Sequence, residues 1–376
     1  MQKTVLCPFL KKTLFSATLS STEPLPPEPS SILVVRLGAI GDVVFSSCLL
    51  PALRQAYPKA YLAWLVEPVA APILQNNPYL DEVIVWDKAQ WLNDLKKGYL
   101  GDLAKKIRAF HHALKARQFD WALDLQGLLK SHLLAYWSGA PYRIGFSSKE
   151  GGHFLLTKTL PKGGQPNQIA SEYRDFGEKT GLVMAPLRFG IHISDQEYEE
   201  ARKLLLDSGV SRAFVVFCPF TTRPQKHWLT KRWASLACTL QRGLGLDIIL
   251  LGGPKDVSEA NALHKKAKGS LKNFVGQTNL RQSMAILGLA QTVIGVDTGM
   301  THAALALGIP TIALFGSTRP YLDRENFKLQ ILYNALPCSP CRRNPVCHGD
   351  YTCMRKITEE DIITALQALN DENPAH

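Results

Sequence analysis

The residues Ile32-Leu-Val-Val-Arg-Leu-Gly-Ala-Ile-Gly-Asp42 indicate the fold class most clearly. Its first four residues, Ile32 to Val35, are β-branched or apolar, as a buried strand requires, and Arg36 ends the run. Gly38 and Gly41 follow, and a helical pattern then continues to about Tyr57. Glycines after a strand permit a tight turn and leave backbone amides at a helix start, where anions bind well. We therefore expect a strand, a ligand-binding turn and a helix.

The same alternation of strand and helix continues along the chain. β-rich runs stand at 61–66, 83–86 and 120–125, and the pattern restarts at 213–218, 247–251, 292–296 and 311–315. It predicts an α/β fold of two doubly wound domains, each a parallel sheet with helices on both faces. Such sheets bind ligands at the carboxyl ends of their strands.

The length of 376 residues suits two such domains. Residues 1–30, acid-poor and then proline-rich, indicate a disordered tail or a targeting segment. We place the N-terminal domain at 31–185 and the C-terminal domain at 186–354, because an irregular stretch separates the two patterns. A last amphipathic helix within 355–376 is expected to pack back on the N-terminal domain.

The net charge of +11 predicts an anionic partner, either nucleic acid, a phosphorylated ligand or an acidic membrane face. Nucleic acid is disfavoured because the basic residues are not interleaved with aromatic ones. No apolar run reaches the roughly 20 residues that span a bilayer. The basic helix predicted at 99–117 is either a solvated face or a contact for anionic lipid headgroups. Cysteine usage indicates a reducing, cytoplasmic compartment.

Three turns that follow predicted strands carry candidate site residues. Asp42 is either a helix N-cap or a general base. The loop Thr221-Thr-Arg-Pro-Gln-Lys-His-Trp228 offers hydroxyls and two cations to a pyrophosphate, or is a polar loop over a packed Trp228. The run Val296-Asp-Thr-Gly-Met-Thr-His302 offers amides at a helix start, or simply a cap and a packed histidine. Three such turns in two doubly wound halves predict one shared site.

These motifs, together with Asp124-Leu-Gln-Gly-Leu-Leu-Lys-Ser131, resemble glycosyltransferase family 9, the lipopolysaccharide heptosyltransferases. The runs at 126–131 and 226–228 are most similar to the heptosyltransferase I group. The resemblance extends from about Ile32 to Ile363. It implies two Rossmann-like domains facing across a cleft, the GT-B arrangement. It also implies an inverting transfer of heptose from ADP-L-glycero-D-manno-heptose to the Kdo-lipid A inner core, by a monomer at the cytoplasmic membrane surface.

The resemblance assigns roles to individual residues. Asp42 matches the catalytic base. The matching donor contacts are Thr221, Thr222, Arg223, Lys226, Asp297, Thr298, Gly299 and His302. The expected acceptor contacts are Gly41, Gln126, Lys130 and Arg143. No Asp-x-Asp pair marks a metal site, so the cations and amides are expected to stabilise the departing diphosphate without an obligatory metal.

Two features depart from a simple match. Relatives carry a ribose-binding glutamate after the strand equivalent to 247–251, where this chain offers only Asp256 or Glu259 as substitutes. Four cysteines lie close together at Cys338, Cys341, Cys347 and Cys353. They could hold a structural zinc ion tetrahedrally, remain reduced or form a disulfide.

Alternatives to this function remain at the level of sequence. The same fold could use another nucleotide sugar or a later heptose acceptor. A binding protein for nucleotide sugars or polyanions, without turnover, is disfavoured because Asp42, Lys226 and Asp297 are all present.

Overall fold

Two parallel sheets organise the chain, whose computed structural model describes residues 27–324 and 327–371. The first sheet contains β1 (Ser31–Val35), β2 (Tyr61–Val66), β3 (Glu82–Val85), β4 (Trp121–Asp124), β5 (Tyr142–Phe146) and β6 (Lys158–Leu160). The second contains β7 (Phe214–Cys218), β8 (Asp247–Leu250), β9 (Lys272–Asn273), β10 (Thr292–Val296), β11 (Thr311–Phe315) and β12 (Leu329–Tyr333). The predicted α/β class is confirmed.

Both sheets have the same strand order. The first runs β3-β2-β1-β4-β5-β6 and the second β12-β11-β10-β7-β8-β9, and each neighbouring pair is parallel. In each half, therefore, the first strand lies beside the fourth. Strands one to three extend the sheet in one direction from this pair, and strands four to six extend it in the other. This is the Rossmann order, and its ligands bind between the first and fourth strands, where the order reverses.

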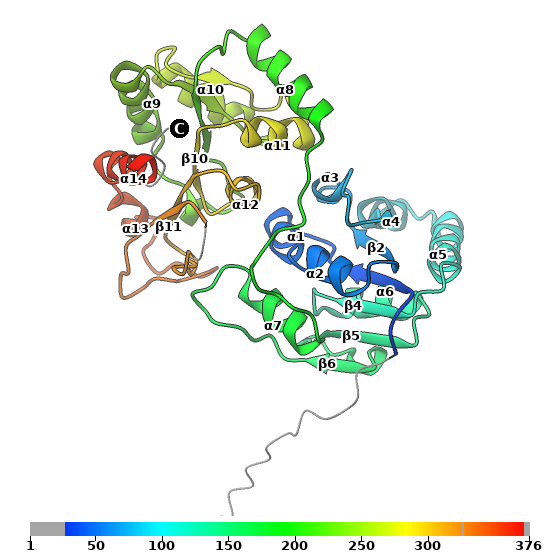
Figure 1. Cartoon of the computed structure of the whole chain (residues 1–376). Helices are drawn as coiled ribbons and strands as arrows, with labels where there is room; N and C mark the ends of the chain where they lie inside the picture. The colour runs from blue at the N-terminus through cyan, green and yellow to red at the C-terminus, as the bar shows by residue number, and fades with distance from the viewer. Residues whose placement is uncertain (1–26, 325–326, 372–376) are drawn as a thin grey trace, which may run out of the picture.

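Helices cover both faces of each sheet (Figure 1). Those of the N-terminal domain are α1 (Ile40–Ser46), α2 (Leu49–Ala56), α3 (Ala71–Leu74), α4 (Lys88–Lys96), α5 (Leu100–Lys115), α6 (Leu129–Trp137), the 3-10 turn η1 (His153–Leu155) and α7 (Ser171–Lys179). Successive residues of β1 point to opposite faces. Ile32 and Val34 join the core under α1 and α2, whereas Leu33 and Val35 join the core under α5 and α6.

The C-terminal domain repeats this plan. Its helical segments are α8 (Asp195–Asp207), η2 (Pro224–Lys226), α9 (Thr230–Leu244), η3 (Pro254–Asp256), α10 (Val257–Lys266), α11 (Leu280–Gly288), α12 (Gly299–Ala306), α13 (Thr352–Arg355) and α14 (Glu359–Asp371). One buried apolar cluster continues from α1 and α2 into α11 and α12, so the two domains share a core. No helix in the described part of the chain is both long and apolar enough to cross a bilayer.

The last helix does not lie where we expected. We predicted that it returns to the N-terminal domain, but α14 packs against α9, β11 and β12 of the C-terminal domain. The reason is its apolar stripe, which includes Ile362, Leu366 and Leu369 and completes the core around Trp228 and Trp233. Residues 1–26 of the predicted tail at 1–30 lie outside the described residues. At the other end of this predicted tail, Ser30 donates two hydrogen bonds to Asp120.

Candidate active site

The four motifs follow the two central strands of each sheet. Asp42 comes after β1, the run from Asp124 after β4, the loop 221–228 after β7 and Asp297 after β10. These strand pairs are the two points where strand order reverses, so each domain places its polar residues where doubly wound sheets bind ligands.

Contact between α1 and α12 brings the two domains together at this point. A methyl group built on Gly41 would lie 2.9 Å from His302 Cδ2. One built on Gly299 would lie 2.6 Å from Ile40 Cγ2 and 3.1 Å from the backbone nitrogen of Gly41. Glycines are therefore required for the two helix starts to approach this closely. Asp42, the next residue of α1, lies at the boundary with the C-terminal motif.

Arg36 holds the Asp42 carboxylate. The two side chains form an ion pair, with 49% of the Asp42 side chain exposed but only 7% of Arg36. Arg36 also donates to the carbonyl oxygen of Leu125 at 3.1 Å, which fixes its guanidinium. Burial opposes its charge, but neighbouring Tyr173 and Asp42 raise the pKa of Arg36, which stays a cation. Sequence reasoning treated Arg36 as the end of a strand and missed this role.

The Asp297 carboxylate is the centre of a buried polar network. Its Oδ2 lies 2.5 Å from Lys226 Nζ and accepts a 2.5 Å hydrogen bond from Thr318, and its Oδ1 lies 2.9 Å from His302 Nε2. Burial alone would raise the pKa of Asp297, but His302 and then Lys226 outweigh it and lower that pKa. The other ring nitrogen of His302 lies 3.0 Å from the Tyr321 hydroxyl.

This network changes how the Asp297 motif can act. A carboxylate whose two oxygens already bind its own chain does not present itself to a ligand, and it would repel a phosphate. Asp297 instead positions Lys226 and His302. Lys226 and the unpaired amides at the start of α12 are then the groups that can meet an anion. Thr318 follows β11, so the same rule of polar residues after strands could have found it.

The loop 221–228 is fixed to the core of the C-terminal domain by Trp228. Trp228 is buried and its Nε1 donates to the Ile357 carbonyl at 3.0 Å, as one of our alternatives expected. His227 Nε2 lies 2.8 Å from the carbonyl oxygen of Thr221. Thr222 is exposed, while Thr221 and Arg223 are half-buried. The anchored loop therefore keeps two hydroxyls and a guanidinium at least partly accessible to a ligand.

The expected acceptor residues divide into two groups. Gln126 accepts a 2.9 Å hydrogen bond from the Leu37 backbone and so ties the β4 turn to the β1 turn. Lys130 Nζ lies 3.1 Å from Glu67, just after β2, on the same edge of the sheet. Arg143 stands near the start of β5 and donates to the carbonyls of Ala140 and Leu155. The structure thus does not bring Arg143 to the carboxyl ends of the strands, where Gln126 and Lys130 lie.

Comparison with known proteins identifies the family of the chain. The sequence model of glycosyltransferase family 9 (heptosyltransferase) matches residues 107–351. The chain belongs to glycosyltransferase family 9. It is therefore a glycosyltransferase, and the two sheets with their facing strand ends are its GT-B domains.

The chain is similar to several curated family members. It is 24% identical to the lipopolysaccharide core heptosyltransferase OpsX of Haemophilus influenzae, over 79% of this chain and 84% of that protein. It is 26% identical to lipopolysaccharide heptosyltransferase 1 of Pseudomonas aeruginosa, over 88% and 89%. Among solved structures, E. coli ADP-heptose heptosyltransferase II superposes with a TM-score of 0.73 and 22% identity, over 92% of this chain and all of that one.

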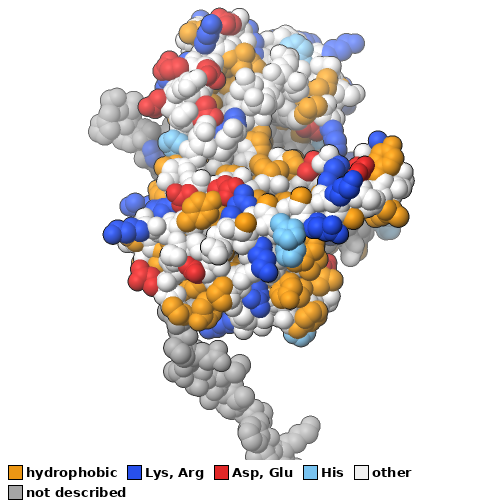
Figure 2. Space-filling view, turned by 90° about the vertical axis from the view of Figure 1, so that its right-hand side faces the viewer, with side chains coloured by type: hydrophobic (Ala, Val, Ile, Leu, Met, Phe, Trp, Pro, Cys, Tyr) orange, Lys and Arg blue, Asp and Glu red, His pale blue; other side chains and the backbone are white. Residues whose placement is uncertain are grey.

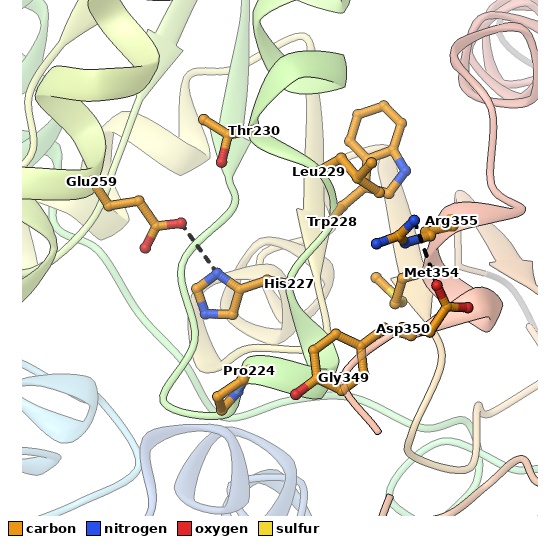
Figure 3. Close-up of a pocket in the computed structure, with 11 residues that line it drawn as sticks. Pro224, His227, Trp228, Leu229, Thr230, Glu259, Gly349, Asp350, Met354 and Arg355 are labelled. Carbon is orange, nitrogen blue, oxygen red and sulfur yellow. Dashed lines mark hydrogen bonds and ion pairs between the residues drawn. The ribbon is translucent and has the colours of Figure 1, made fainter. Parts of the chain in front are cut away.

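A pocket of about 350 Å³ opens in the C-terminal domain of this family 9 enzyme (Figure 3). Its wall includes His227 and Glu259, whose side chains lie 3.3 Å apart, but not Asp42, Lys226 or Asp297. Of the two predicted substitutes for the ribose-binding glutamate, Asp256 accepts from the Gly253 amide at 2.8 Å and caps η3. Glu259 keeps a side chain that is 45% exposed, beside His227 of the loop 221–228.

The four clustered cysteines line one cavity of about 250 Å³ as free thiols. Burial, and then the neighbouring thiols, raise the pKa of Cys341 and of Cys353, which keeps both protonated. Within the described ranges, no three His, Cys, Asp or Glu side chains are placed to hold a metal ion. The reduced state is the arrangement seen, and a zinc site stays a prediction.

Proposed function

We propose that this enzyme transfers heptose from an ADP-heptose donor to the lipid-linked inner core of lipopolysaccharide, with inversion at the anomeric carbon. The observation that supports the proposal is the contact between α1, which contains Asp42, and α12, which begins within the run 296–302 that we assign to the donor. Relatives whose names give lipopolysaccharide core heptose transfer support the substrate class.

The geometry supports a general-base mechanism. The Asp42 carboxylate removes the proton of the acceptor hydroxyl, whose oxygen bonds to the anomeric carbon as the bond to the diphosphate breaks. Negative charge then develops on the departing diphosphate. Lys226, Arg223 and the first amides of α12 are the positive groups available to stabilise it, so an obligatory metal is not required.

We further propose that the nucleoside of the donor lies toward His227 and Glu259. Glu259 pairs with His227, but its side chain stays 45% exposed and can accept from ribose hydroxyls, whereas Asp256 is used as a cap. The acceptor then enters over Gly41, Gln126 and Lys130 in the N-terminal domain. We expect a monomer that works at the cytoplasmic face of the inner membrane.

Two acceptors fit this proposal, because the similarity to a heptosyltransferase 2 also favours a later heptose acceptor. Heptosyltransferase 2 of Salmonella typhimurium is 25% identical over 91% of this chain, as similar as the heptosyltransferase 1 relatives. The enzyme could therefore add either the first heptose to Kdo-lipid A or a later one to a heptosylated core.

A donor and acceptor screen tests the function. Calorimetry with ADP-heptose, ADP-glucose and UDP-sugars should show tightest binding of ADP-heptose. Mass spectrometry of products made on Kdo-lipid A and on heptosylated Kdo-lipid A then identifies the acceptor. Preference for a UDP-sugar, or no added heptose on either acceptor, would contradict the proposal.

Metal analysis decides between the alternatives for the cysteines. We expect protein purified without added zinc to contain no stoichiometric metal, and all eight of its cysteine thiols to react with a thiol reagent after unfolding. One zinc per chain that is lost in Cys341→Ser but kept in Cys238→Ser would instead establish the structural zinc site.

A further inference from the structure

The apolar side chains exposed on this enzyme are concentrated on one side of the N-terminal domain. Of sixteen large apolar side chains exposed in the described chain, eight lie between α4 and η1. They are Leu92, Leu95, Tyr99, Leu100, Leu129, Leu133, Tyr136 and Phe154. We call the surface that carries them the α4–η1 face. Phe154 is the most exposed of all, at 76%.

The elements that carry the α4–η1 face lie next to one another. The rings of Trp91 on α4 and Phe110 on α5 lie 5.6 Å apart, and those of His111 on α5 and Trp137 on α6 are also 5.6 Å apart. η1 packs on α6 in turn. Figure 2 shows apolar and basic side chains gathered on the lower, N-terminal half of this side.

Positive charge surrounds these apolar side chains. The segment from Lys88 to Lys115, which contains α4 and α5, carries seven Lys or Arg and two Asp, a net charge of +5 (seven minus two). Both acids are paired, Asp94 with Lys106 at 2.6 Å and Asp102 with Lys105 at 3.8 Å. Single exposed leucines are normal on soluble proteins, but a contiguous apolar patch rimmed by cations fits an anionic lipid surface.

The position of the face matches an acceptor held in a bilayer. Leu129 begins α6 directly after the β4 turn, at the strand-end edge where Gln126 and Lys130 lie. Gly152, beside η1, packs on Leu129: a methyl group built there would lie 2.6 Å from its Cδ1. The exposed patch thus continues up to the edge of the proposed acceptor site.

We propose that the α4–η1 face docks this enzyme on an anionic lipid bilayer. Leu133, Tyr136 and Phe154 enter the headgroup region, and the lysines of α4 and α5 contact lipid phosphates. Only the purpose of the docking rests on the proposed function: it would bring a lipid-linked acceptor to the carboxyl ends of the strands. The docking itself follows from the surface.

Vesicle flotation tests the docking. Wild type should float with vesicles of phosphatidylglycerol and phosphatidylethanolamine, and not with phosphatidylcholine vesicles. Two double variants, Leu133→Gln/Phe154→Gln and Lys96→Glu/Lys97→Glu, should each lower the partition coefficient about tenfold or more. Matched changes on the other domain, Leu206→Gln/Leu244→Gln and Lys265→Glu/Lys266→Glu, should leave it unchanged.

Further measurements separate this proposal from its alternatives. Heptose transfer to an acceptor dispersed in detergent micelles should be the same in all four variants, which also shows that they fold. If that transfer is absent in wild type, the proposed function fails while flotation still reports on docking. Equal flotation of face and control variants would overturn the docking, and so would a dimer, seen by sedimentation velocity, that the face variants abolish.

Discussion

At the scale of single residues, the site depends on two carboxylates in opposite roles. Asp42 is half exposed and held at one side by Arg36, which leaves it available to an acceptor hydroxyl. Asp297 is buried and both of its carboxylate oxygens are engaged, so it positions Lys226 and His302 rather than meeting substrate. The difference comes from burial and from the number of partners, since both residues follow a central strand.

Lys226 should matter to both the ligand and the fold. Lys226→Met keeps the apolar stem but removes the ammonium, and buried Asp297 then loses a charge partner. We expect ADP affinity to fall about tenfold or more and the unfolding free energy to fall by roughly 1–3 kcal/mol. Calorimetry and urea unfolding measure these effects. Exposed Lys231→Met, on α9, is the control, and equal ADP affinity in the two variants would contradict the assignment.

Much of the site could be predicted at this scale, and part could not. Polar residues directly after apolar runs identified Asp42, Lys226 and Asp297. The partner of Asp42 could not be found in this way, because Arg36 reaches it only once β1 and β4 are paired and the Leu125 carbonyl fixes its guanidinium. Whether a carboxylate faces ligand or its own chain is likewise decided by tertiary packing.

At the scale of elements, the closeness of α1 and α12 depends on Gly299. In Gly299→Ala the new methyl group meets Ile40 at 2.6 Å and the Gly41 backbone, which cannot move as a side chain can. We expect a loss of about 1–3 kcal/mol of stability from overpacking, and a large fall in kcat.

Gly243→Ala is the matched control, because a methyl group there has nothing within 4 Å. In this helix it should stabilise the protein by about 0.5–1 kcal/mol and leave kcat unchanged. Thermal unfolding and steady-state transfer compare the two variants. Wild-type kcat in Gly299→Ala would mean that the spacing of the helices is not critical.

Glu197 on α8 provides a pH-dependent tie between elements. It pairs with Arg281 on α11, which also donates to the Pro72 carbonyl in α3 of the other domain at 3.2 Å. Burial alone would raise the pKa of Glu197, but hydrogen bonds from Arg281 and Ser194 lower it from 4.5 to about 2. Its stabilising effect is therefore complete above pH 4.5 and is lost as the pH falls toward 2.

Glu197→Gln tests this tie. We expect the variant to lose roughly 2 kcal/mol of unfolding free energy at neutral pH, and the difference from wild type to shrink between pH 4.5 and pH 2. Urea unfolding across this pH range measures it. Glu199→Gln, whose side chain is 71% exposed, should differ little from wild type at any pH. A difference that stays constant with pH would refute the linkage.

Elements with strong apolar patterns were predictable, and weakly patterned ones were not. The eight runs that we identified all became strands, within one or two residues at each end. β5 contains Arg143 and Gly145, and β9 has only two residues, so neither resembles a buried strand by composition. The destination of α14 depended on which apolar surface was left uncovered, a property of the assembled domain.

At the scale of the whole molecule, two copies of one sheet plan face each other. Strand alternation was enough to predict two doubly wound domains, and the resemblance to glycosyltransferase family 9 predicted that they face each other. They could not predict that α1 and α12 touch, because contact between domains depends on the shapes of both. Our account of the enzyme depends on that contact, since the base and the positive groups for the leaving diphosphate come from different domains.

Single-turnover transfer by Asp42→Asn, with ADP binding measured alongside, tests that account most directly. The amide keeps the size of the carboxylate but cannot remove a proton, so we expect transfer to fall by about a hundredfold or more while ADP affinity stays near that of wild type. Exposed Asp207→Asn, on α8, should behave as wild type. Transfer by Asp42→Asn at the wild-type rate would contradict the account.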